Sequence, residues 1–72
     1  ISLVTVMEQT NGNIQSYRLE YKKGKRWYTL FEGIVPECRV KQHRFSPVDA
    51  EKVRITVTRH HGTVALTEVG VY

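Results

Sequence analysis

The chain has 72 residues, of which 40% are hydrophobic and 25% charged, and its formal net charge is +4. This length excludes more than one domain and allows only a thin core, because so small a domain buries about 60% of the surface its unfolded chain exposes. The single cysteine, Cys38, excludes an internal disulfide and a cysteine-rich metal site, and no apolar run is long enough for a membrane-spanning helix.

Short β-rich segments separated by turn signals follow one another along the whole chain, and no segment has a helical pattern of useful length. Strands are expected over residues 1–8, 14–22, 27–31, 38–45, 53–58 and 64–72. The first is apolar on both faces, and Asn11-Gly12 after it favours a tight turn. The sequence has no signal peptide and begins directly in a strand-like segment, which indicates a mature or excised piece of a longer protein.

The second and third strands are expected to form a hairpin around Gly24. Residues 18–26 hold five of the eleven basic side chains. One interpretation is an anion-binding surface. The other, which the pattern favours, is a scaffold hairpin in which Tyr21 and Trp27 bury their rings in the core while the lysines keep the turn in water and discourage edge-to-edge pairing.

The second half of the chain is less regular. In the fourth strand Val40 and Phe45 have opposite phases, which predicts a β-bulge near residues 42–43. Ser46 is a candidate cap for one helical turn. The polar residues 59–63 are expected to turn the chain into the last hairpin.

Six strands in one small domain indicate a sandwich or barrel. The motifs are Y-x-L-x-Y, G and W-x-x-L-x-x-G within residues 17–33, then F-x-P-V-x-A-x-x-V-R-I at 45–55 and L-T-E-V-G-V-Y at 66–72. In this order they resemble the discoidin, or coagulation factor V/VIII type C, family of galactose-binding-like jelly rolls. The pattern is most similar to the C-terminal module of family 29 α-L-fucosidases.

The resemblance implies an all-β fold, an antiparallel jelly-roll β-sandwich, with residues 1–72 as one segment that forms the C-terminal part of a discoidin-like module. The module would be incomplete, because the family's D-G-x-x-x-T-x-W segment is not in this sequence. Residues 34–40 and 4–7 also depart from the family pattern, which has a glycine-centred motif at the first position and an acidic residue at the second.

The same resemblance implies a non-catalytic accessory module, carbohydrate-binding or structural, of a secreted glycoside hydrolase, with an α-L-fucosidase as the expected parent. Its partners would be a glycan or the parent catalytic domain, its location extracellular or periplasmic, and it would need no cofactor. The alternative is an adhesion-type discoidin module that binds protein, glycan or phospholipid at a cell surface. Membrane insertion is not expected, because the loops lack apolar spikes. Nucleic acid is not expected either, because acids are interleaved with the basic residues.

Candidate sugar contacts are His43, Arg59, His60 and His61, since imidazole and guanidinium groups on a loop can hydrogen-bond sugar hydroxyls. The simpler interpretation of the last three is a polar turn. A metal site is not expected, because adjacent residues of a strand point to opposite faces and three or four ligands must converge.

The remaining chemistry-bearing residues have structural interpretations. Arg54 is expected to pair with an acid such as Glu68 on a neighbouring strand, and Cys38 to be a small buried residue. No catalytic residue is expected, because the sequence has no nucleophile pattern, no phosphate-binding glycine loop and no distinct pair of carboxylates.

Overall fold

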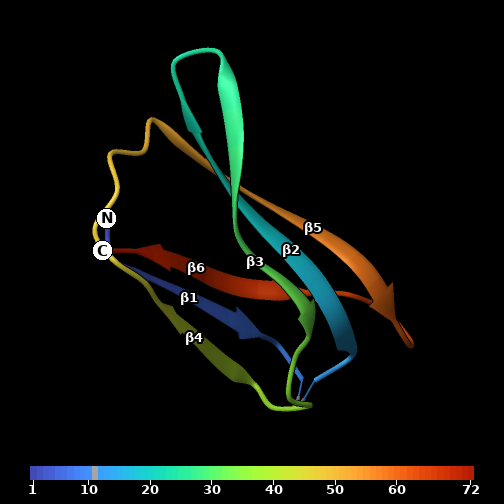
Figure 1. Ribbon diagram of the computed structural model, residues 1–72. Coiled ribbons are helices and arrows are strands. Elements are labelled where there is room, and N and C mark those ends of the chain that lie inside the picture. The colour runs from blue at the N-terminus through green and yellow to red at the C-terminus, as the bar shows by residue number, and fades with distance from the viewer. Residues whose placement is uncertain (11) are drawn as a thin grey trace.

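The computed structural model describes residues 1–10 and 12–72, and over this range it contains six strands and no helix (Figure 1). The strands are β1 (Leu3–Glu8), β2 (Ile14–Lys23), β3 (Arg26–Ile34), β4 (Val40–Arg44), β5 (Lys52–His60) and β6 (Leu66–Val71). The all-β prediction is confirmed. The helical turn expected at Ser46 is wrong, because residues 46–50 run as an irregular connection to β5.

Two antiparallel three-stranded sheets make up the fold, in the orders β4-β1-β6 and β3-β2-β5. Among the described strands, β2 and β3 are the only two that follow each other in the sequence and also pair in a sheet. Every other connection between successive strands crosses from one sheet to the other. The last hairpin expected across residues 59–63 is wrong: β5 pairs with β2, and β6 pairs with β1. Gly62, at a φ of 64°, does turn the chain, but the residues after it carry the chain to the opposite sheet before β6 begins.

The core lies between the two sheets, as in a β-sandwich. Strand β1 alternates strictly, so that Val4 and Val6 face inward while the residues between them are half-buried. Among the described residues, the buried apolar side chains are Val4, Val6, Ile14, Tyr17 and Leu19, all at 0% exposure, and Val35 at 3%. Because they come from the central strand of each sheet and from the segment after β3, they hold both layers together.

Strand β4 pairs with β1 without interruption from Leu3 opposite Arg44 to Met7 opposite Val40, so the bulge expected at residues 42–43 is wrong. The inward positions of β4 are Lys41 and His43, opposite Val6 and Val4, and Val40 is 45% exposed. The strand ends at Arg44, and both of its inward positions carry polar side chains. The spacing of the apolar residues in this segment therefore suggested a bulge where the strand is regular.

A bulge is present elsewhere, in strand β3 of the β2–β3 hairpin. Leu19 pairs with Phe31 and Glu20 with Thr29, so one extra residue stands on β3. An extra residue inverts the facing of everything beyond it. Phe31 therefore packs against the core while Trp27, opposite Lys22, lies half-buried on the outer face, and the core position expected for Trp27 is wrong.

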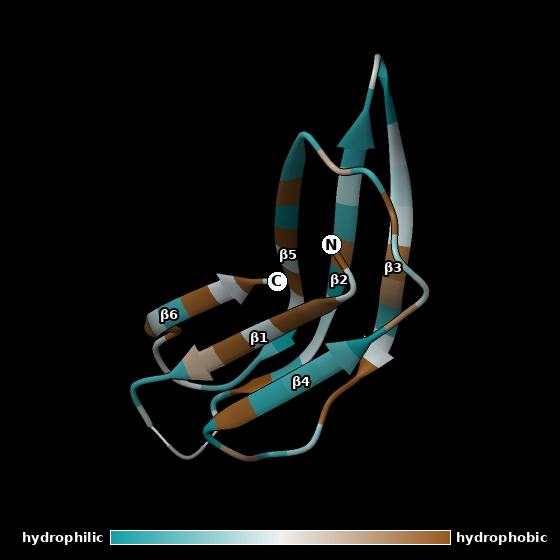
Figure 2. Ribbon diagram, turned by 90° about the vertical axis from the view of Figure 1, so that its left-hand side faces the viewer, coloured by the Kyte–Doolittle hydropathy of each residue, from teal (hydrophilic) through white to brown (hydrophobic). Residues whose placement is uncertain are grey.

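Strand β2 runs between two ends of the molecule that differ in structure. At one end the β2–β3 hairpin projects beyond the rest of the fold (Figures 1 and 2). At the other, residues 9–10 and 12–13 come together with residues 35–39 and 61–65, and we call these described segments the loop end. Along one side, where β5 and β6 are edge strands, an open groove of about 480 Å³ exposes Val69 and Val71.

Candidate functional site at the loop end

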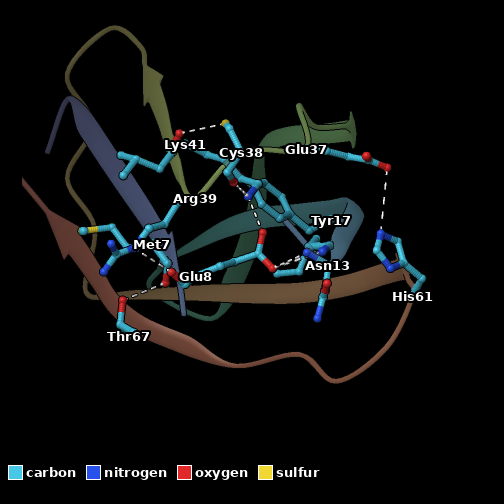
Figure 3. Close-up of polar contacts among 12 residues, drawn as sticks. Met7, Glu8, Asn13, Tyr17, Glu37, Cys38, Arg39, Lys41, His61 and Thr67 are labelled. Carbon is cyan, nitrogen blue, oxygen red and sulfur yellow. Dashed lines mark hydrogen bonds and ion pairs between the residues drawn. The ribbon is translucent and has the colours of Figure 1, made fainter. Parts of the chain in front are cut away.

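The loop end is built on a buried ion pair. Glu8 is in phase with Val4 and Val6 on β1, so its carboxylate points inward, where it meets the ammonium group of Lys41 from β4 (Figure 3). Each side chain is only 1% exposed. A pair so desolvated is stable only when its remaining hydrogen-bonding groups are satisfied.

Those groups are satisfied by the neighbouring loops. Glu8 Oε1 accepts hydrogen bonds from the backbone N–H groups of Asn13, at 3.0 Å, and Ile14, at 3.1 Å. The Lys41 ammonium also donates to the carbonyl of Cys38. One carboxylate and one ammonium therefore fix the start of β2 and the segment before β4.

Gly12 lets two of these loops approach closely. Its φ is 114°, and a Cβ placed there would lie 2.7 Å from the carbonyl carbon of Glu37. The tight turn expected at Asn11-Gly12 involves Asn11, which lies outside the described residues. Asn13 ties in the third loop: its Nδ2 donates to the Thr63 carbonyl at 2.8 Å, and its own carbonyl accepts from the His61 N–H at 2.9 Å.

His43 lies in the interior, between the sheets. Its Nε2 is hydrogen-bonded to the Tyr17 hydroxyl, and its ring contacts that of Phe31 at a centroid distance of 4.4 Å. Burial lowers the pKa of His43, so the imidazole is neutral near pH 7. Burial likewise raises the pKa of Tyr17, and electrostatic interactions with Cys38 and Glu8 raise it further.

Above this interior the loop end carries an open cavity of about 380 Å³. Its lining residues are Gln15, Ile34, Val35, Glu37 and Arg59. A guanidinium, a carboxylate and an amide thus stand beside aliphatic side chains. These groups supply both donors and acceptors for hydroxyl groups, next to the exposed apolar side chain of Ile34.

The predicted site residues divide between two places. Arg59 lines the cavity, and His61 Nε2 lies 4.0 Å from Oε1 of Glu37, which lines it too (Figure 3). His60 lies next to both and is exposed, with its Nδ1 3.1 Å from the Gly62 carbonyl oxygen. His43, in contrast, is engaged between the sheets.

Sequence reasoning missed Gln15 and Glu37 as members of this site, and Glu8 and Lys41 as its support. The alternation of β1 contained a signal for Glu8, since it continues the inward phase of Val4 and Val6. Lys41 precedes His43 by two residues, so the two side chains lie on the same face of β4. Nothing in the local pattern marks Gln15.

A second polar cluster lies on the outer face of the other sheet. Glu20 Oε1 accepts from Arg18 at 3.1 Å and from Arg54 at 3.0 Å, and the Arg54 guanidinium stacks 4.0 Å from the centre of the Trp27 ring. The partner expected for Arg54, Glu68, is therefore wrong. Desolvation raises the pKa of the Glu20 carboxyl, but the hydrogen bonds and charges of Arg54 and Arg18 outweigh it and lower this pKa overall.

Other kinds of site find no geometric basis in the part of the chain that the structure describes. No three side chains of His, Cys, Asp or Glu lie together there as metal ligands would. Nor do residues 1–10 and 12–72 form a helix that could span a membrane. Cys38 is a free thiol and is half-buried, more open than the buried position expected for it.

Comparison with protein-family models, curated proteins and solved structures finds no match for this chain.

Proposed function

We propose that this chain is a non-catalytic, carbohydrate-binding accessory module with a discoidin-like jelly-roll fold, attached to a secreted glycoside hydrolase of the α-L-fucosidase type. The observation that carries the proposal is the loop-end cavity, where Arg59, Glu37 and Gln15 surround a space of about 380 Å³. The family motifs of the sequence support the choice of parent enzyme.

The chemistry of the cavity suits a neutral sugar. A sugar ring presents hydroxyl groups that both donate and accept, together with an apolar face of C–H groups. Arg59 donates, Glu37 accepts, Gln15 does both, and the aliphatic side chains of Ile34 and Val35 can contact the apolar face. The buried Glu8–Lys41 pair beneath holds these loops in place before a ligand arrives, which lowers the entropic cost of binding.

The proposal is tested by titrating the protein with L-fucose and with fucosylated oligosaccharides in a calorimeter. Arg59→Ala removes the main donor of the cavity and is expected to weaken binding at least about tenfold, equivalent to one or two charged hydrogen bonds. Arg44→Ala is the control, because it removes an exposed arginine from β4. Unchanged affinity in Arg59→Ala and in the double variant His60→Ala/His61→Ala would overturn the proposal.

A structural role is the second form of the same proposal, and the groove between β5 and β6 favours it. Val69 and Val71 are 41% and 42% exposed there. Packing this groove against the parent catalytic domain would bury apolar surface without any ligand. In the full-length protein, Val69→Thr/Val71→Thr would then lower the melting temperature of the catalytic domain while sugar binding stays unchanged. An unaltered melting temperature would exclude this role.

The adhesion-type alternative gains one observation from the structure. Ile34 is 87% exposed at the loop end, so one apolar side chain does stand out there. A phospholipid-binding module would use such a side chain, and Ile34→Ser would then abolish sedimentation with phosphatidylserine vesicles. Absence of vesicle binding by the unmodified protein would dismiss this alternative.

A further inference from the structure

The projecting hairpin is a second surface with a different chemistry. We call it the basic arm, defined as Tyr21–Tyr28 together with Lys52, which pairs with this hairpin across β2. Its cationic side chains are Lys22, Lys23, Lys25, Arg26 and Lys52. All of these except the half-buried Lys22 are exposed, and the tip is hydrophilic (Figure 2).

The positive charges of the basic arm are not neutralised within the fold. Among the residues that the structure describes, none of its five cations forms an ion pair. Glu51 also reaches the tip, where its carboxylate accepts a hydrogen bond from the N–H of Gly24 at 3.1 Å, so one negative charge stands beside the five cations. The arm therefore carries a local excess of positive charge that attracts anions.

The strand register places like charges opposite each other. Lys22 pairs with Lys52 across β2 and β5, and Lys23 pairs with Arg26 across the hairpin. Like charges directly opposite on neighbouring strands are destabilising. An anionic ligand placed between them would remove this repulsion as it binds, so the arm gains more from an anion than isolated lysines would.

The aromatic side chains of the arm indicate which anion fits. Tyr21 stacks on Tyr28 at a centroid distance of 5.2 Å, and the guanidinium of Arg54 covers one face of Trp27. One face of each ring is thus occupied within the fold, which leaves at most one face per ring for a base of a single-stranded nucleic acid. Four of the five cations are lysines, which bind anionic groups as point charges and without a fixed bidentate geometry, so repeated charged groups along a flexible polymer can meet them.

We propose that the basic arm binds an acidic polysaccharide through its sulfate or carboxylate groups. The choice of ligand class rests on the proposed function, but the site does not: Lys23 and Gln15 lie near opposite ends of β2, so the arm and the loop-end cavity are separate. The module would then hold a charged glycan with one end and a neutral sugar with the other.

The test compares dextran sulfate with neutral dextran, two polymers that share a backbone. Lys23→Gln/Lys25→Gln is the arm variant, and Arg18→Gln/Arg44→Gln removes the same charge from positions outside both the arm and the loop end. We expect dextran sulfate to bind the unmodified protein with an affinity that falls as salt rises. The arm variant should weaken this binding at least about fivefold, as expected for two exposed ionic contacts, and the control less than twofold.

Equal losses in the two variants would overturn the proposal, because the binding would then follow net charge alone. Tighter, arm-dependent binding of a single-stranded oligonucleotide, or of vesicles containing phosphatidylserine, would overturn it in favour of those partners. The effect of Arg59→Ala on L-fucose binding is measured on the same samples. If the measurement contradicts the proposal for one site, the measurement for the other site can still be interpreted.

Discussion

The two ends of β2 use charge in opposite ways. At the start of the strand, Glu8 and Lys41 are both 1% exposed, and their hydrogen bonds connect the surrounding loops. At the other end, Lys23 and Lys25 are exposed beside the turn of the hairpin. The first arrangement makes charge part of the core, and the second leaves charge available to a partner.

The difference shows how a 72-residue sandwich supports a shaped surface with few core residues. Six apolar side chains are buried in the part of the chain that the structure describes, five of them completely, which is a small core, and the Glu8–Lys41 network extends it to the loop end. A buried pair contributes little net stability compared with apolar packing, but the loss of one partner is costly. Changes at the loop end should therefore lower stability strongly, and charge changes on the arm hardly at all.

The largest effect is expected from breaking the buried pair. Glu8→Gln leaves the Lys41 ammonium buried without a counter-charge, and Lys41→Met leaves the Glu8 carboxylate in the same state. Each should lower the free energy of unfolding by about 3–5 kcal/mol, measured by urea denaturation. Lys25→Gln, at the arm, is the matched control and should change it by less than about 0.5 kcal/mol. Comparable losses at the two ends would refute the contrast.

A smaller effect is expected from glycine substitution. Gly12→Ala forces a non-glycine residue to a φ of 114° and places a methyl group against the backbone of Glu37, so it should cost about 1–3 kcal/mol from backbone strain and more from the collision. Gly24→Ala, at a φ of 64° with open space around it, should cost about 1–2 kcal/mol. The two variants are compared by thermal unfolding, and a larger loss for Gly24→Ala would contradict the account.

The interior beneath the loop end should make the fold sensitive to mild acid. The pKa of His43 is lower in the folded protein than its ordinary value of 6.5. Below that pH, the imidazole therefore binds a proton more readily in the unfolded chain than in the folded one. This contribution to stability is complete above pH 6.5 and is lost as the pH falls, by at most about 1.4 kcal/mol per pH unit.

The measurement is the free energy of unfolding between pH 7.5 and 5.0. His43→Gln retains a polar partner for Tyr17 but cannot titrate, so its stability should fall less steeply over this range than that of the unmodified protein. Parallel curves for the two proteins would show that another group is responsible.

The smallest effect is expected from the outer cluster of Glu20, Arg18 and Arg54. Its ion pairs are partly solvated, and exposed pairs contribute little. Because the pKa of Glu20 is lowered on folding, its contribution is present above pH 4.5 and is lost as the pH falls further. Glu20→Gln should remove this acid sensitivity and change the urea midpoint at pH 7 less than Glu8→Gln does. A larger shift for Glu20→Gln would reverse the ranking.

The strands could be predicted from the sequence because each is a local pattern. The alternation of Tyr17, Leu19 and Tyr21 with charged residues indicates β2 directly, and all six strands lie where turn signals separate apolar runs. The pairing could not be predicted in the same way. Whether β6 joins β5 or β1 depends on contacts between distant segments, and the residues from 59 to 65 are compatible with either a hairpin or a crossing between sheets.

The face on which a side chain lies was predicted wrongly where the strand has a local irregularity or a buried polar side chain. The extra residue in β3 moved Trp27 to the outer face, and the polarity of Lys41 and His43 hid the inward phase of β4. For the candidate site, the clustering of polar residues near a turn made it possible to name Arg59, His60 and His61 as candidates. Glu37 and Gln15 join them only through folding, which the sequence pattern does not reveal.

The most direct test of the account is a double-mutant cycle on Glu8 and Lys41, built from Glu8→Gln, Lys41→Met and the double variant and measured by urea denaturation. The account predicts strong coupling, about 2–3 kcal/mol, with the double variant more stable than the sum of the single changes implies. Additive losses, within about 0.5 kcal/mol, would show that the two charges act independently and that the loop end is not held by their pairing.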